Sequence, residues 1–72
     1  MKNELLLQLG QKIRYERIKR GLSQEDLEEL STVSRRTISE IERGNADIRY
    51  TNLCAIAKAF NLNISELLNF KL

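Results

Sequence analysis

One stretch, from Ser23 to Gly44, constrains the fold more than any other part of the chain. Its apolar residues recur at helical spacing on either side of a short polar gap, which predicts two helices over 24–30 and 35–43 joined by a tight turn. Two helices this short are marginal by themselves and need packing partners. The residues before and after the stretch are therefore expected to form the scaffold that holds it.

Capping residues mark the ends of these two helices. Ser23 is followed three residues later by Asp26, a pattern close to a capping box with Asp in place of Glu or Gln. Ser34 is a candidate N-cap for the second helix. Gly44 suits a helix end with a positive φ angle, which glycine adopts without steric cost.

The remaining sequence predicts three more helices and no strand. Apolar spacing indicates helices over about 3–20, 48–60 and 64–69, and runs with the alternation of a β-strand are absent. The 72 residues include no proline and only three glycines, a composition that favours helix throughout. We therefore predict an all-α fold of five helices in a single domain over residues 1–72.

Local signals refine the three outer helices. Gly10 lies inside the first one and is expected to weaken it, so that its first turns fray or bend. Asp47 is a candidate N-cap for the fourth helix. Asn63 and Glu66 form a box-like cap for the fifth.

Enzymatic chemistry has little support in the sequence. The chain has no histidine, the usual general base. Its single cysteine, Cys54, cannot form an internal disulfide and lies near an apolar stripe, which favours a packing role in a reducing compartment. No metal-ligand cluster, glycine-rich phosphate loop or membrane-length apolar run is present. We therefore predict no catalytic residue, no metal, no cofactor and a cytoplasmic location.

Charge is unevenly distributed, although the net charge is only +2. Acidic residues gather in the second predicted helix, and basic residues in the first and third. Those of the first helix are Lys12, Arg14, Arg17, Lys19 and Arg20. The folded molecule is therefore expected to have a basic side and an acidic side.

Long polar side chains gather on one face of the helix predicted over 35–43. They are linked by steps of three or four residues and share the side opposite Ile38 and Ile41: Arg35, Arg36, Ser39, Glu40 and Arg43. Such a face is often merely solvated. A short helix that braces a projecting, arginine-rich helix is also how helix-turn-helix proteins enter the DNA major groove, where arginine can bond guanine O6 and N7 together.

The same residues resemble a known family. LSQEDLEELSTVSRRTISEIERG, followed by LCAIAKAFNLNISELL, is similar to the Cro/C1 (XRE, phage lambda repressor-like) helix-turn-helix DNA-binding family. The similarity covers about residues 13–68, and its most specific parts lie at 22–25, 41–44 and 57–60. Members of this family are five-helix domains that usually act as transcription regulators, commonly as dimers on two-fold sites.

The resemblance implies a role for each polar residue of the stretch. The helix over 35–43 would be the recognition helix in the major groove. Base reading is implied for Arg35, Arg36, Ser39 and Glu40. Contacts with DNA phosphates are implied for Ser23, Gln24, Ser34, Thr37, Arg43, Asn45 and Arg49. Arg17 and Glu42 match a partly buried ion pair of the family, so they are expected to be structural.

Two residues depart from the family's pattern. The fifth residue of the motif is usually alanine, because the two helices approach closely there, and here it is Glu28. The ninth is usually glycine with a positive φ, and here it is Thr32, whose branched side chain disfavours that conformation. Either the helices are slightly spread with Glu28 directed outward, or the turn is altered.

Apolar residues gather at both ends of the chain. The C-terminal ones are predicted to form a homodimer interface, unless they cover the leucines near the N-terminus: Leu67, Leu68, Phe70 and Leu72. A dimer would read the two halves of an inverted-repeat operator, roughly 34 Å apart.

The sequence therefore predicts a sequence-specific, double-stranded DNA-binding transcription regulator, a dimeric repressor or autoregulator located with the nucleoid. Small autoregulatory repressors, restriction–modification controllers and antitoxins of this family have a similar size and layout. The alternative is a protein-interaction module, an antitoxin or anti-repressor with the same fold. Its partner would be a toxin or another protein, held in part by the acidic helix over 24–30.

Overall fold

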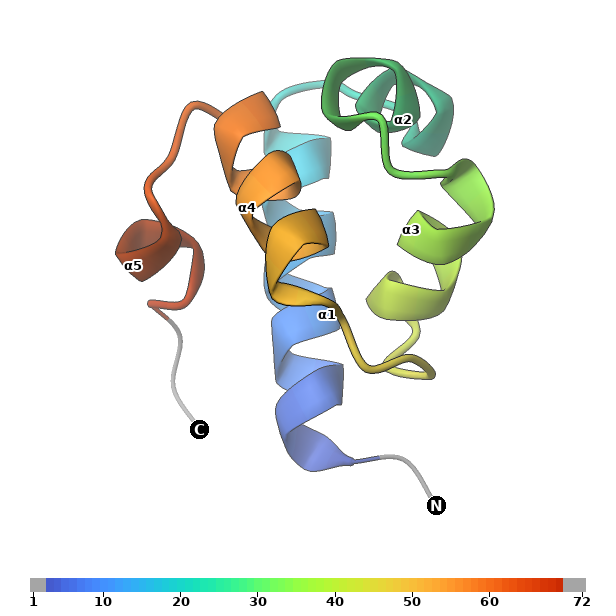
Figure 1. Ribbon diagram of the computed structural model, residues 1–72, viewed down its shortest axis with the longest axis vertical. Coiled ribbons are helices and arrows are strands. Elements are labelled where there is room, and N and C mark those ends of the chain that lie inside the picture. The colour runs from blue at the N-terminus through green and yellow to red at the C-terminus, as the bar shows by residue number, and fades with distance from the viewer. Residues whose placement is uncertain (1–2, 70–72) are drawn as a thin grey trace.

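The computed structural model describes residues 3–69, which fold into five helices and no strand. The helices are α1 (Glu4–Lys19), α2 (Gln24–Ser31), α3 (Arg35–Glu42), α4 (Tyr50–Ala59) and α5 (Ile64–Leu67). α1 and α4 run through the centre, with α3 on one side of them and α5 on the other, while α2 bridges α3 and α4 (Figure 1). Within the described range no helix is both long and apolar enough to span a bilayer.

Reciprocal caps begin α2 and α5, as their spacing predicts. Asp26 N–H donates to Ser23 Oγ, and Ser23 N–H donates to the Asp26 carboxylate, each at 2.9 Å. Asn63 and Glu66 repeat the arrangement at 2.8 and 2.9 Å. These two capping boxes are confirmed, and they define where each helix begins.

The predicted bounds of α4 and α5 were too wide. α4 begins at Tyr50, and its N-cap is Arg49, which makes no side-chain capping hydrogen bond, so the predicted Asp47 cap was wrong. Ile48 packs against the core from the non-helical segment before α4. α5 is a single turn that ends at Leu67.

One apolar core joins all five helices. Its largest fully buried side chains come from each of them: Ile13, Leu27, Ile38, Ile56, Phe60 and Leu67. Burying a side chain of this size contributes about 1.5–3 kcal/mol relative to exposure. α3 is thereby fixed to the scaffold through its apolar face.

The burial of Leu67 corrects part of the predicted dimer interface. Leu67 is 0% exposed, because α5 folds back onto α4 and places this side chain in the core. It therefore cannot contribute surface to a contact between protomers. Leu68 is 41% exposed and can contribute surface to such a contact. Phe70 and Leu72 lie outside the described residues.

Gly10 does not interrupt α1, and the first turns are helical, contrary to the predicted fraying. The helix is continuous from Glu4 to Lys19, and Gly10 is buried where α1 crosses the end of α3. A Cβ atom at this position would lie 2.2 Å from the backbone oxygen of Ile41. The missing side chain lets the two helices approach closely, which positions α3 against α1.

Candidate nucleic-acid interface

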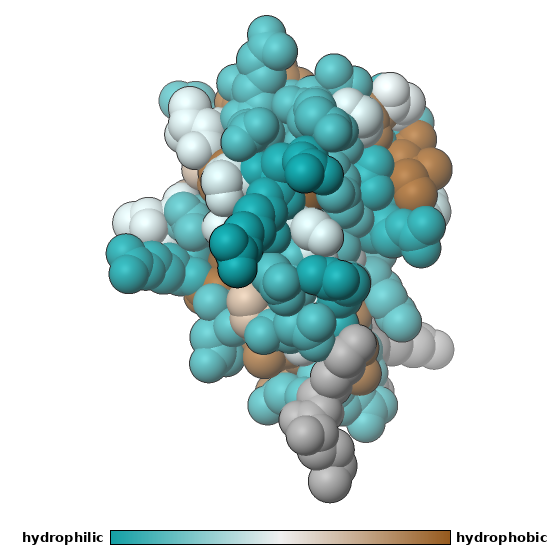
Figure 2. Space-filling model, turned by 90° about the vertical axis from the view of Figure 1, so that its right-hand side faces the viewer, coloured by the Kyte–Doolittle hydropathy of each residue, from teal (hydrophilic) through white to brown (hydrophobic). Residues whose placement is uncertain are grey.

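α3 separates its apolar and polar residues between two faces. Ile38 and Ile41 are 0% and 2% exposed, whereas Arg35 and Arg36 are exposed. Figure 2 shows the side of the molecule on which α3 lies, and hydrophilic residues cover most of it. Ser39 and Glu40 are half-buried on the next turn. The four predicted base-reading residues thus lie along one short helix whose opposite face is anchored.

The first turn of α3 carries two caps. Ser34 Oγ accepts the N–H of Thr37 at 3.1 Å and donates to Thr37 Oγ1 at 2.8 Å. Glu28 Oε2 accepts the N–H of Arg35 at 3.0 Å. Ser34 and Thr37, both predicted phosphate contacts, therefore bond each other in the free protein, and Glu28 reaches across the turn to α3.

The turn keeps a left-handed residue at its ninth position although that residue is not glycine. Thr32 has φ 64° and ψ 8°, and its N–H donates to the Glu28 carbonyl at 2.8 Å. The buried hydroxyl of Ser31 donates to Leu27 O at 2.7 Å and accepts the N–H of Val33 at 3.1 Å. The turn therefore keeps the left-handed conformation expected at this position, so the alternative of an altered turn is wrong. Glu28 is exposed at the surface.

Arg17 and Glu42 join α1 to the last residue of α3. Arg17 Nε donates to Glu42 Oε2 at 2.7 Å and Nη2 donates to Oε1 at 3.0 Å, a bidentate pair whose side chains are 11% and 4% exposed. Arg17 Nη1 also donates to the Leu22 carbonyl at 2.7 Å. Hydrogen bonds to Glu42 raise the pKa of Arg17 against the opposing effect of burial, so the guanidinium stays charged.

Gln24 is tied to the same ion pair. Its Nε2 donates to Glu42 Oε1 at 3.2 Å, and the side chain is half-buried. A side-chain amide has two N–H donors, so one remains for a phosphate. Of the other predicted phosphate contacts, Ser23, Asn45 and Arg49 are exposed, and Arg43 is exposed and bonded to Glu40 at 2.9 Å.

Sequence reasoning missed a buried carboxylate on α1 itself. Glu16 is 5% exposed, with Lys12 Nζ at 2.8 Å and Arg20 Nη1 at 2.6 Å. Arg20 also donates to the Phe60 carbonyl at 2.9 Å and lies 4.9 Å from the centre of that ring. Lys12 and Arg20 were counted toward a basic surface, yet both are paired. Their four-residue spacing from Glu16 is the signal that indicates this.

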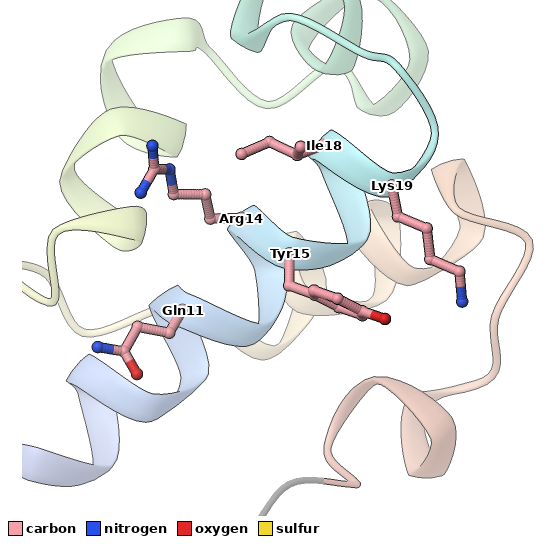
Figure 3. A pocket seen from close by; sticks show the side chains of 5 residues that line it. All are labelled: Gln11, Arg14, Tyr15, Ile18 and Lys19. Atoms are coloured by element: carbon pink, nitrogen blue, oxygen red, sulfur yellow. The ribbon is translucent and has the colours of Figure 1, made fainter.

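The outer face of α1 forms a shallow surface depression, and all of its lining residues among residues 3–69 come from α1 itself. Figure 3 shows its lining side chains along one stripe of the helix: Gln11, Arg14, Tyr15, Ile18 and Lys19. Tyr15 and Ile18 are 58% and 54% exposed. The depression contains neither an acid nor a nucleophile with a base, and no group of three potential metal ligands occurs within residues 3–69.

Comparisons of the sequence with known proteins find helix-turn-helix regulators. The helix-turn-helix family model matches residues 13–67. The control protein C.BamHI of Bacillus amyloliquefaciens is 38% identical over 71 residues, which span 97% of this chain and 88% of that protein. The competence pilus inhibition repressor of Acinetobacter baylyi is 33% identical over 85% of this chain and 56% of its own length.

Solved structures agree in fold. The restriction-modification controller protein C.AhdI from Aeromonas hydrophila superposes with a TM-score of 0.83 at 35% identity, covering 86% of this chain and 94% of that one. The clp gene regulator ClgR from Corynebacterium glutamicum gives a TM-score of 0.85 at 28% identity, covering 94% of this chain and 72% of the other. The chain therefore belongs to the XRE, lambda repressor-like helix-turn-helix family of DNA-binding transcription regulators and is not an enzyme.

Proposed function

We propose that the protein reads a specific double-stranded DNA sequence with α3 in the major groove. The observation that carries the proposal is the division of α3 into a buried apolar face and an exposed face bearing Arg35 and Arg36 on its first turn. Recognition helices present their N-terminal residues to base edges. The planar fork of an arginine can bond guanine O6 and N7, whereas Ser39 and Glu40 would contact bases one turn further on.

Phosphate contacts would flank this reading surface. The proposed set comprises Ser23, Gln24, Ser34, Thr37, Arg43, Asn45 and Arg49. Arg43 illustrates how such a contact can form, because its bond to Glu40 joins side chains that are 58% and 36% exposed. A pair this exposed is worth about 0–1 kcal/mol, so Arg43 can leave Glu40 for a phosphate at little cost. Glu40 would then be free to accept from a cytosine amino group.

We further propose a two-fold dimer on a short inverted repeat, acting as a repressor or autoregulator in the cytoplasm. Half-exposed Leu68, directly after α5, supports a contact there, and a module this small gains affinity by reading two half-sites. Sedimentation at micromolar concentration tests the dimer. A species of only 8.4 kDa would contradict it.

The DNA proposal is tested by selecting bound sequences from a random duplex pool and then measuring variants on the selected site. Arg36→Ala is expected to cost about 1–3 kcal/mol on the selected site and much less on random DNA. Lys58→Ala removes the same charge from α4 and serves as the control. An equal loss on both DNAs would make Arg36 a phosphate contact.

A protein-interaction module is the rival, and the acids of α2 support it less than their number suggests. Glu28 accepts the Arg35 N–H, Asp26 accepts the Ser23 N–H, and Glu25 lies 3.7 Å from Arg35 Nε. These carboxylates therefore have partners within the chain. No binding to any duplex at low salt would favour the rival.

A further inference from the structure

We infer that Glu28 is a positioning residue for DNA reading, because its carboxylate holds the first turn of α3. The inference rests on the proposed function of α3. Glu28 stands at a position where the family pattern usually has alanine, which has no side chain that could accept this hydrogen bond. It concerns a residue of α2 for which no base or phosphate contact is proposed.

Glu28 is bonded to the turn and to the next helix at once. Its backbone oxygen accepts the Thr32 N–H at 2.8 Å, and its Oε2 accepts the Arg35 N–H at 3.0 Å. The Arg35 N–H is one of the first four of α3, which have no acceptor inside the helix. Ser34 Oγ takes the Thr37 N–H of the same turn. The two side chains therefore satisfy different donors and together close the first turn.

The position of this turn matters more for bases than for phosphates. Arg35 and Arg36 leave the backbone within it, and a bidentate contact with guanine needs placement within about 0.5 Å. Contacts with phosphates tolerate a looser helix, because they depend chiefly on net charge. Loss of the Glu28 cap is thus expected to lower binding to the selected site while binding to random DNA is kept.

Three substitutions separate the hydrogen-bond acceptor from the charge. Glu28→Gln keeps an oxygen at the same reach and removes the charge. Glu28→Asp keeps the charge and shortens the side chain by one methylene, so that the oxygen no longer reaches the Arg35 N–H. Glu28→Ala removes both. Because Glu28 is exposed, none of these changes touches the core.

The experiment measures Kd on the selected operator and on a random duplex of equal length, at one salt concentration. Glu28→Ala and Glu28→Asp should each lower the ratio of specific to random affinity by about fivefold, the equivalent of losing a helix cap. Glu28→Gln should keep the ratio within about twofold, while removing one negative charge strengthens both affinities. Glu29→Ala, an exposed neighbour on α2, is the control and should keep the wild-type ratio.

Hydrogen exchange of the Arg35 amide gives a readout that needs no DNA. Exchange should be faster in Glu28→Ala and Glu28→Asp than in wild type, and unchanged in Glu28→Gln. A ratio that is unchanged in Glu28→Ala, or lowered equally by Gln and Ala, would overturn the inference. If the wild type binds no duplex, the proposed function fails, and the exchange data then show separately whether Glu28 holds the turn.

Discussion

The two ends of α3 are held in opposite ways. Its C-terminal end is fixed from α1 by buried contacts, namely the close crossing at Gly10 and the bidentate pair of Arg17 with Glu42. Its N-terminal end is held by surface contacts, among them the Glu28 cap and the loose approach of Glu25 to Arg35. One end thus anchors the helix, while the other is accessible for reading.

Burial decides what an arginine does in these two regions. The side chain of Arg17 is 11% exposed and that of Arg35 is 57% exposed, although each faces a glutamate. Removing one partner of a buried pair leaves an uncompensated charge, whereas an exposed pair exchanges partners at little cost. The anchored end is therefore costly to change, and the reading end can vary while the fold is kept.

The largest effect is expected at the anchored end from Arg17→Ala. Loss of the guanidinium leaves the Glu42 carboxylate buried without its charge partner and should lower the free energy of unfolding by about 3–5 kcal/mol. Denaturant unfolding measures the change. Arg14→Ala, an exposed arginine on the same helix, should stay within about 0.5 kcal/mol of wild type. An unchanged melting temperature in Arg17→Ala would show that the pair with Glu42 does not hold the C-terminal end of α3.

Gly10→Ala is expected to cost about 3 kcal/mol, since the new methyl group meets the Ile41 carbonyl and forces α1 and α3 apart. The matched variant is Gly21→Ala, where φ is +70° but nothing lies within 4 Å of the added carbon. Only the left-handed strain of about 1–2 kcal/mol applies there. Thermal unfolding that shows equal losses would mean that the crossing at Gly10 is not tight.

Glu16→Gln tests the second buried carboxylate, and its cost should be about 2 kcal/mol at neutral pH. Hydrogen bonds from Lys12 and Arg20 keep the pKa of Glu16 below its ordinary value of 4.5, against desolvation. Because the folded pKa is the lower one, its stabilisation is complete above pH 4.5 and is lost as the pH falls through the folded value. Unfolding curves measured from pH 7 downward should therefore converge for wild type and Glu16→Gln. Curves that stay parallel would contradict this.

At the reading end, Thr32→Gly is expected to raise the free energy of unfolding by about 1 kcal/mol, because a β-branched residue at φ 64° is strained. Asn61 has φ 59°, but asparagine tolerates this conformation, so Asn61→Gly should gain less. Melting temperatures compare the two. A loss of stability in Thr32→Gly would mean that its side chain contributes more than its strain costs.

The smallest effect is expected for the Arg43–Glu40 pair. A double-mutant cycle with alanine should give a coupling of less than about 0.5 kcal/mol in the free protein, because both side chains are largely solvated. A coupling above 1 kcal/mol would show that the surface of α3 is held as firmly as its anchored end, and the contrast between the two ends would fail.

Local signals were enough for three of the helix starts and for the end of α3. The capping boxes of α2 and α5, the Ser34 cap and the left-handed Gly44 depend on residues a few positions apart, so spacing alone indicates them. The predicted start of α4 was two residues too early. Ile48 packs against the core from outside the helix, and its apolar character alone does not distinguish that position from a helical one. The prediction placed Leu67 in a dimer interface. Helical spacing shows that this side chain lies on an apolar face, but it does not show whether that face packs against the core or against a second protomer.

The amino-acid sequence by itself determined that five helices form, the caps of α2, α3 and α5, and the apolar face of α3, because each depends on periodicity and short-range hydrogen bonds. Only the tertiary structure decided what Gly10, Glu16 and Glu28 do. Gly10 allows a close helix crossing, Glu16 is buried between two cations, and Glu28 reaches the first amide of the next helix. The close crossing at Gly10, the bond from Glu28 to α3 and the burial of Glu16 depend on how elements approach one another in space. Residue spacing within one helix indicates the two cations beside Glu16, but it does not contain those distances.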